Sequence, residues 1–210
     1  MFHQLQADSP LRLVPFLAMV QLGSSIGNTD YIVSLLEKLN GYFVQWKSLP
    51  LEKQDAYLKI SDATSVLADK LVSFESLAKA LLLPLKDPKQ GVQLAMRACK
   101  LAIETPCVLV FDEFITMQAL THLDPKLVTL LKIFNQGSLK DYQAFVAENP
   151  VILKEAGISG EKCLEKMRVL TLASLACAHI GKELAYSEIE SLLQIGADQA
   201  EAWLMKGTFL

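Results

Sequence analysis

The sequence lacks the cysteine spacing, the long apolar runs and the charge blocks that mark several classes of protein. Its 210 residues include four cysteines, Cys99, Cys107, Cys163 and Cys177, and no Cys-x-x-Cys pair. A domain of this size needs no disulfide framework, so we expect reduced and buried thiols. No apolar run approaches the roughly 20 residues of a membrane-spanning helix.

The N-terminal region gives little support for secretion. The apolar stretch 13–20 resembles the core of a signal peptide, but only Arg12 supplies a positive charge ahead of it and Asp8 opposes that charge. Residues 21–25 offer no convincing cleavage site. We therefore expect a cytoplasmic protein that does not act at a membrane.

The charge balance argues against binding to nucleic acids. The chain has 20 Lys and Arg residues against 23 Asp and Glu residues, which gives a net charge of −3 and a pI near 5.7. Proteins that bind nucleic acids present a basic patch to the phosphates, and this sequence contains no block of like charge. We expect no direct sequence-specific contact with nucleic acid and no polybasic membrane tether.

Apolar residues, by contrast, are abundant. Hydrophobic residues make up 51% of the chain and charged residues 20%, against about 25% charged in typical domains. The mean hydropathy is +0.29. This composition excludes disorder, and it suggests more apolar surface than one small core can bury, which predicts protein partners.

Helix-start signals recur along the whole chain. A residue that favours the N-cap precedes a proline at Ser9-Pro10, Asp87-Pro88, Thr105-Pro106 and Asp124-Pro125. Pairs with capping-box spacing are Asp87 with Gln90, Ser138 with Asp141, and Ser187 with Glu190. We expect helices to begin at these sites and to end at glycines, namely Gly137, Gly157, Gly181 and Gly196.

The segments between these signals have helical periodicity. One apolar stripe runs through Leu127, Leu130, Leu131 and Phe134. Further stripes cover the stretches 32–39 and 139–146, and the stretch 169–180 is apolar nearly all round, which predicts a helix buried on most sides.

Evidence for strands is thin. Residues 108–111 form the one short run of strand-forming residues, and the Thr105-Pro106 signal favours a helix there too. We therefore predict an all-α fold of about ten helices between residues 10 and 206, packed in antiparallel pairs as an irregular helical-repeat solenoid.

The last thirty residues have a different pattern. A polar break at 181–183 precedes a short helix at 187–194, a turn at Ile195-Gly196 and a second short helix at 197–206. This helix-turn-helix pattern is typical of a winged-helix module, which also needs a small sheet. We predict a helical-repeat part at 1–181 and the start of a winged helix at 182–210, cut short before its sheet.

The sequence contains no catalytic constellation. Asp112-Glu113 follows an apolar run as in nucleotide hydrolases, but no glycine-rich phosphate loop accompanies it. His3, His122 and His179 are not clustered with other ligands at metal-binding spacings. The second helix of the terminal pair carries Asp198 and Glu201, which would repel DNA phosphates. We predict no enzyme activity, no metal and no cofactor.

Arg168 lies at the start of the most apolar segment, between Met167 and Val169. An unpaired guanidinium is unfavourable there, so its side chain either extends to solvent or forms a structural ion pair with Glu190 or Glu201.

The apolar C-terminal end leaves two alternatives open. Trp203, Met205, Phe209 and Leu210 either form an apolar edge that contacts a partner or fold back onto the helical body.

Several stretches resemble the subunit M family of eukaryotic translation initiation factor 3, whose members carry a PCI domain. The most specific are 166–172, 187–193 and 194–198 with Glu201-Ala202-Trp203, and those at 111–123, 127–134 and 139–142 are similar in order and spacing. Weaker similarity extends to about residue 11. The resemblance implies a helical repeat followed by a winged helix.

The resemblance also implies a function. It suggests a non-catalytic scaffold subunit that acts in translation initiation through contacts with other PCI-type subunits, and indirectly with the small ribosomal subunit. The same fold also serves as a scaffold in the COP9 signalosome and the proteasome lid, and this alternative stays open. The turn at 195–198 favours the initiation factor.

Overall fold

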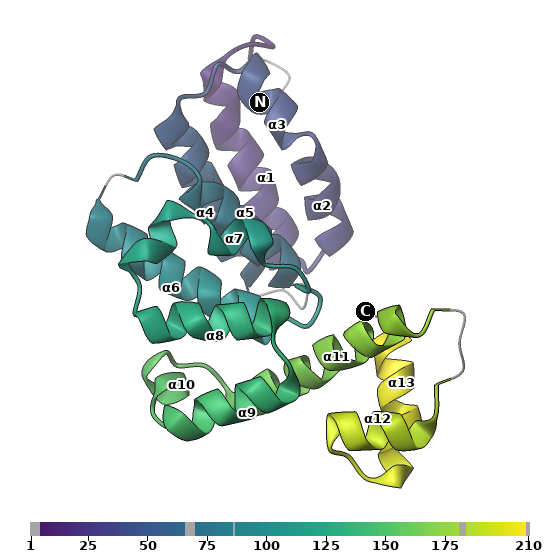
Figure 1. The fold of residues 1–210 in the computed structure, drawn as a ribbon. Helices are drawn as coiled ribbons and strands as arrows, with labels where there is room; N and C mark the ends of the chain where they lie inside the picture. Colours follow the sequence, from purple (N-terminus) through teal and green to yellow (C-terminus); the bar gives the residue numbers. More distant parts are fainter. Residues whose placement is uncertain (1–4, 66–69, 86, 181–183, 209–210) are drawn as a thin grey trace. The chain divides into compact units, whose positions relative to one another are not determined.

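The computed structural model describes residues 5–65, 70–85, 87–180 and 184–208. The chain divides into two compact units, Met1–Leu101 and Ala102–Leu210. The described residues form thirteen α-helices and contain no strand, so the predicted all-α solenoid class is confirmed (Figure 1).

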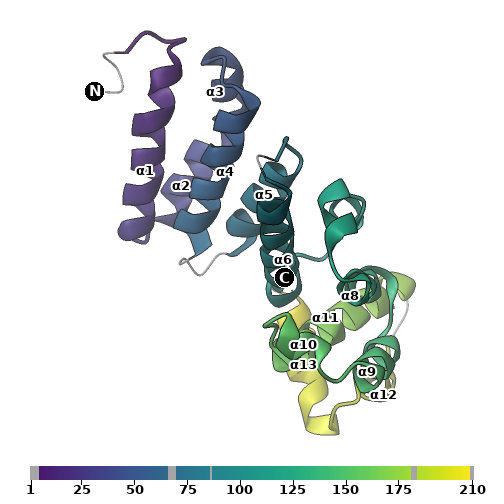
Figure 2. The same ribbon diagram turned by 90° about the vertical axis from the view of Figure 1, so that its left-hand side faces the viewer.

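The first unit consists of helices that pack mainly against their sequence neighbours. A short 3-10 turn at Pro10–Arg12 leads into α1 (Leu13–Ser25), α2 (Thr29–Glu37), α3 (Leu39–Gln45), α4 (Pro50–Ser65) and α5 (Lys70–Leu81). α6 (Pro88–Glu104) begins in this unit. α4 packs against both α1 and α5, and Figure 2 shows α1, α4 and α5 as successive members of this stack.

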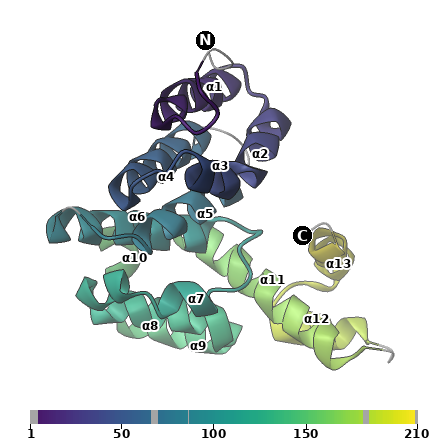
Figure 3. The ribbon, with the colours of Figure 1, turned by 90° about the horizontal axis from the view of Figure 1, so that it is seen from above.

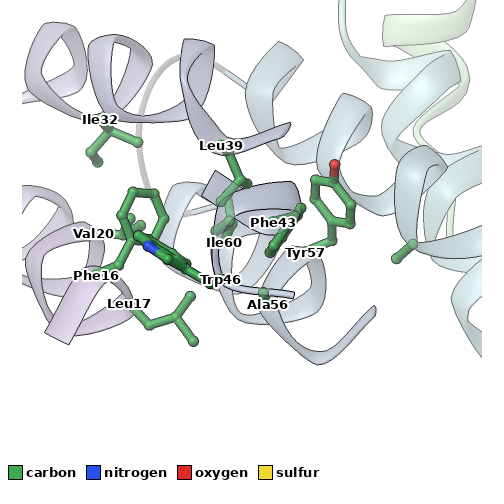
Figure 4. Packing of buried hydrophobic residues seen from close by; sticks show 11 residues of the cluster. Phe16, Leu17, Val20, Ile32, Leu39, Phe43, Trp46, Ala56, Tyr57 and Ile60 are labelled. Carbon is green, nitrogen blue, oxygen red and sulfur yellow. The ribbon is translucent and has the colours of Figure 1, made fainter. Parts of the chain in front are cut away.

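An aromatic cluster forms the core between α1, α3 and α4. The ring of Trp46 is fully buried and stacks on Tyr42 with centroids 4.8 Å apart, while the edge of Phe16 meets it at 5.8 Å. Figure 4 shows Phe16 and Trp46 together with Val20, Leu39 and other members of this cluster. Such contacts combine a large apolar area with specific geometry, so they fix how these helices pack.

Small polar residues let α4 and α5 approach closely. The hydroxyls of Ser61 and Ser73 lie 3.0 Å apart, and each also donates to the backbone carbonyl of the other residue at 2.9 Å. Both side chains are buried and hydrogen-bonded, so their burial carries no unsatisfied polar group.

The second unit is built around one long helix. It contains α7 (Asp112–Ile115), a 3-10 turn at Gln118–His122, α8 (Pro125–Gln136), α9 (Leu139–Glu148), α10 (Ile152–Glu155) and α11 (Gly160–Ala178). After α11 come α12 (Tyr186–Leu193), a 3-10 turn at Ala197–Gln199 and α13 (Ala200–Thr208). α11 packs against α9, α12 and α13. Figure 3 shows from above how α11 runs towards α12.

Several predicted helix signals are confirmed in this unit. Leu127, Leu130, Leu131 and Phe134 are all buried. The side chain of Asp124 caps α8 by accepting from the backbone N–H of Lys126 at 2.8 Å.

The capping box that begins α9 is formed as predicted. The Ser138 side chain accepts from the Asp141 backbone, and the Asp141 side chain accepts from the Ser138 backbone. The Ser138 hydroxyl also donates to Oδ2 of Asp141 at 2.7 Å. This bond and the one from the Ser138 backbone N–H lower the pKa of the Asp141 carboxyl, because they favour its charged form.

Two other predicted helix starts were wrong. Residues 105–111 form a turn and irregular chain rather than a helix, because Phe111 gives its N–H to the Asn135 side chain, 3.1 Å away, instead of to a helical carbonyl. α12 begins one residue before Ser187, so the predicted capping box with Glu190 does not form.

The predicted helix ends also differ in part. Gly157 has the expected left-handed backbone, with φ of 63°, but Gly196 has φ of −74°. Gln194 takes the left-handed conformation at the end of α12 instead, with φ of 53°. Gly181 lies outside the described residues.

The segment 169–180 is less buried than predicted. Val169, Thr171, Leu172 and Leu175 are buried, but residues 173, 174 and 176–178 of α11 are exposed. The side chains on this face of α11 are small, so their exposure leaves little apolar area in water, but Ile180, beyond the end of α11, is 80% exposed.

Truncation of one core side chain tests this packing. We expect Leu131→Ala to lower the free energy of unfolding by about 2–5 kcal/mol, because it leaves a cavity in a fully packed site. The exposed neighbour provides the control, and Lys132→Ala should change stability by less than about 0.5 kcal/mol. Urea denaturation followed by circular dichroism measures both, and equal midpoints for Leu131→Ala and the parent would contradict this packing.

Candidate functional site

Arg168 joins three helices of the second unit. Its Nε donates to the carbonyl oxygen of Leu193 at 3.0 Å, and its Nη2 donates to the carbonyl oxygen of Gln194 at 3.1 Å. The guanidinium carbon lies 5.6 Å from the centroid of the Trp203 ring. The Arg168 side chain, on α11, thus binds the C-terminal end of α12 and packs over the Trp203 ring of α13.

These partners correct the predicted ion pair. In the part of the chain that the structure describes, Glu190 and Glu201 form no ion pair with Arg168, whose partners are backbone carbonyls. The last carbonyls of a helix lack intrahelical donors and carry the negative end of the helix dipole, so they attract a cation as a carboxylate does. The planar guanidinium can bond two of them at once.

Gln194 provides a second connection at the same point. Its side-chain amide forms a reciprocal pair with that of Gln143 on α9, with N···O distances of 2.7 and 3.0 Å. Its left-handed backbone turns the chain, and the N–H of Ile195 bonds the carbonyl of Glu190 at 3.1 Å.

An apolar cluster lies beneath this junction and fixes the terminal helix pair to α11. Its buried members are Leu172, Leu175, Ile189, Leu193 and Ala200. Trp203 is half-buried against the cluster, and a groove of about 550 Å³ runs along it and the first turns of α11.

Arg168 and Trp203 therefore meet in one place, although we predicted separate roles for them. Met205 is 55% exposed, and Phe209 and Leu210 lie outside the described residues. Whether these residues form a partner interface stays a prediction.

Sequence reasoning missed a buried cation, Lys166. Only 3% of this residue is exposed, and its ammonium group donates to the carbonyl oxygens of Ala102 and Thr105, the latter at 2.7 Å. It also lies 4.7 Å from the centroid of the Phe111 ring. The group therefore bonds the carbonyl end of α6, as Arg168 does for α12.

Burial lowers the pKa of Lys166 to about 7, since the charged form loses hydration, while the nearby thiols of Cys107 and Cys163 act in the opposite direction. The sequence contained one signal of this burial: Lys166 follows Cys163 at helical spacing and so lies on an apolar stripe.

The outer face of α1 is an apolar surface. Val14 and Leu22 of α1, Leu11 just before the helix and Ile26 just after it are each 60–69% exposed, while Phe16 and its neighbours on the opposite face are buried. No charged residue occurs between Leu13 and Thr29. Large apolar side chains that are exposed together on one face mark a candidate contact surface.

The described residues contain no group of three or more potential metal ligands, and none of their helices is long and apolar enough to cross a membrane. All four cysteines are free thiols. Cys99 and Cys163 are buried as predicted, whereas Cys107 and Cys177 are exposed.

The chain matches no protein-family model, but it is similar along nearly its whole length to curated proteins named eukaryotic translation initiation factor 3 subunit M. The protein from Chaetomium globosum is 29% identical over 96% of this chain and 50% of its own length. The protein from Aspergillus clavatus is 30% identical over 97% and 46%. The mouse protein is 27% identical over 98% and 55%.

The chain is a homologue of subunit M of eukaryotic translation initiation factor 3. The family resemblance found in the sequence is thereby confirmed, from fungi to mammals. The chain spans about half the length of the curated subunit M proteins it matches. The most specific stretches of the resemblance lie on α11 to α13, around Lys166, Arg168 and Trp203.

Replacement of Arg168 tests the junction. We expect Arg168→Met to raise amide hydrogen exchange in α12 and α13 at least several-fold and to leave α1–α4 unchanged, because the carbonyls of Leu193 and Gln194 lose their donors. Glu190→Gln is the control and should have no such effect. Unchanged exchange in both variants would show that Arg168 does not hold the terminal helices.

Lys166 predicts a pH dependence of stability. Its pKa is about 7 in the folded chain against 10.5 for an ordinary lysine, so between these values the unfolded chain binds more protons. The free energy of unfolding should therefore rise with pH from 7 to about 8.5, by at most about 1.4 kcal/mol per pH unit. Above pH 9 the buried thiols of Cys99 and Cys163, with pKa values raised to about 12, oppose this rise.

Urea denaturation at several pH values measures this slope. Lys166→Met should remove it, whereas Lys154→Met, at an exposed position, should keep it. An identical slope in Lys166→Met and the parent would assign the effect to another group.

Proposed function

We propose that this chain serves as a non-catalytic scaffold in eukaryotic translation initiation factor 3, where it acts through protein–protein contacts in the cytoplasm. The observation that carries this proposal is the similarity of 96–98% of the chain to proteins named as subunit M of that factor. These relatives are named as a subunit of the factor, which supports a role within a multi-subunit complex.

The exposed apolar surfaces support action by contact. Repeat-type helical stacks expose long surfaces, and their ends need to be covered. The outer face of α1, with Val14 and Leu22 exposed to water, is such a surface in the first unit. Met205, on the last helix of the second unit, is a smaller candidate.

The predicted partners and module remain part of this proposal. We propose that other PCI-type subunits contact the chain directly and that the small ribosomal subunit is reached indirectly. The helices α12 and α13 support the proposal that residues 182–210 begin a winged helix, since they provide its helix-turn-helix.

Affinity purification of the tagged chain from eukaryotic cells tests the proposal. Mass spectrometry should identify the other subunits of initiation factor 3, and part of the chain should sediment with small ribosomal subunits in a sucrose gradient. Recovery of signalosome or proteasome-lid subunits instead would favour the alternative complexes and contradict the proposal.

A charge on the outer face of α1 should weaken this assembly. We expect Leu22→Glu to reduce recovery of the other subunits at least tenfold, about 1.4 kcal/mol, because a carboxylate must be dehydrated in an apolar contact. Leu22 is 60% exposed, so the substitution should leave the fold intact. Ala147→Glu adds the same charge on an exposed site of α9 and should have no effect. Full recovery with Leu22→Glu would exclude this face from the contact.

A further inference from the structure

A small pocket lies between α2, α3, α4 and α5 within the first unit. Its volume is about 220 Å³, and the apolar part of its wall is formed by Val33, Leu36, Leu39 and Val72. Figure 4 shows Leu39 near Tyr57, another lining residue, beside the aromatic cluster. The pocket is thus built on the packed core rather than on a loop.

The size of the pocket restricts what it can hold. Sites for drug-sized ligands have volumes of about 300–1,000 Å³, so this pocket fits a single side chain better than a cofactor or metabolite. In protein interfaces a few residues that fill well-packed pockets supply most of the affinity, so a pocket of this size can accept one such anchor.

The polar lining leaves hydrogen-bonding capacity at the pocket. The hydroxyl of Tyr57 donates to Oδ1 of Asn40 at 2.8 Å. This bond uses Oδ1 of Asn40 as an acceptor and so orients the amide. The N–H groups of Asn40 point elsewhere and can donate, and the Tyr57 oxygen keeps a lone pair that can accept. Both residues line the pocket.

The charges at the mouth favour a cation. Glu75 and Lys79 form a long ion pair of 4.0 Å, and both are about half exposed. Glu37 is exposed and is the last residue of α2, where the helix dipole disfavours a carboxylate. A positive charge placed beside Glu37 would be attracted by both the carboxylate and the carbonyl end of α2.

We propose that this pocket binds one apolar side chain of a partner protein and that the segment carrying it has a positive charge next to this anchor. The partner is thus an apolar–basic segment, in which the apolar group enters the pocket and the basic group faces Glu37. The proposal does not depend on the identity of the complex, because it concerns a site on the isolated chain.

Two small probes with the same ring and linker and opposite charge test the proposal on the full chain. Phenethylammonium combines an apolar ring with a cation, and 3-phenylpropionate combines the same ring with an anion. Titrations followed by methyl NMR should shift the signals of Val33, Leu36, Leu39 and Val72 in a saturable way. The cation should bind about two- to fivefold more tightly than the anion, as expected for one partly exposed charge pair.

Two variants sharpen the test. Glu37→Gln should abolish the preference for the cation while binding of the ring remains, and Glu148→Gln, an exposed glutamate of α9, should change nothing. Val33→Phe should fill the pocket and weaken both probes.

The proposal is overturned if neither probe gives saturable shifts at these methyl groups. Equal affinity for the two probes, or a preference that survives Glu37→Gln, also overturns it.

Discussion

Carbonyl groups at the ends of two helices, and the cations that bond them, hold the second unit together. The ends of α6 and α12 each leave carbonyls without intrahelical donors. Lys166 bonds those at Ala102 and Thr105, and Arg168 bonds those at Leu193 and Gln194. The two cations are two residues apart on α11, so they point in nearly opposite directions. One helix therefore joins two others through the same physical interaction, once in a buried setting and once near the surface.

The features that were predictable from the sequence are those that residue type and spacing encode directly. The stripe from Leu127 to Phe134 and the capping box at Ser138 belong to this class, because both depend on residues within one or two turns. The helix expected after Thr105-Pro106 failed because its outcome depended on Asn135, which is distant in the sequence. Local signals cannot include such partners.

The candidate sites show the same limit more clearly. The sequence indicated that Arg168 needs a partner, but it pointed only to carboxylates as candidates. Backbone carbonyl groups occur at every residue, so no residue type marks the ones that accept a hydrogen bond from Arg168. Lys166 escaped notice because lysines usually reach solvent along their flexible stems. The pocket beside Glu37 was not predictable at all, since its wall comes from four separate helices and exists only after they pack.

The placement of the two tryptophans gives each unit its own spectroscopic reporter. Trp46 is enclosed in the aromatic cluster of the first unit, whereas Trp203 is only half-buried beneath a guanidinium in the second. An enclosed indole emits at shorter wavelength than one in contact with water. Intrinsic fluorescence should therefore resolve whether the two units melt together or in succession, without any label.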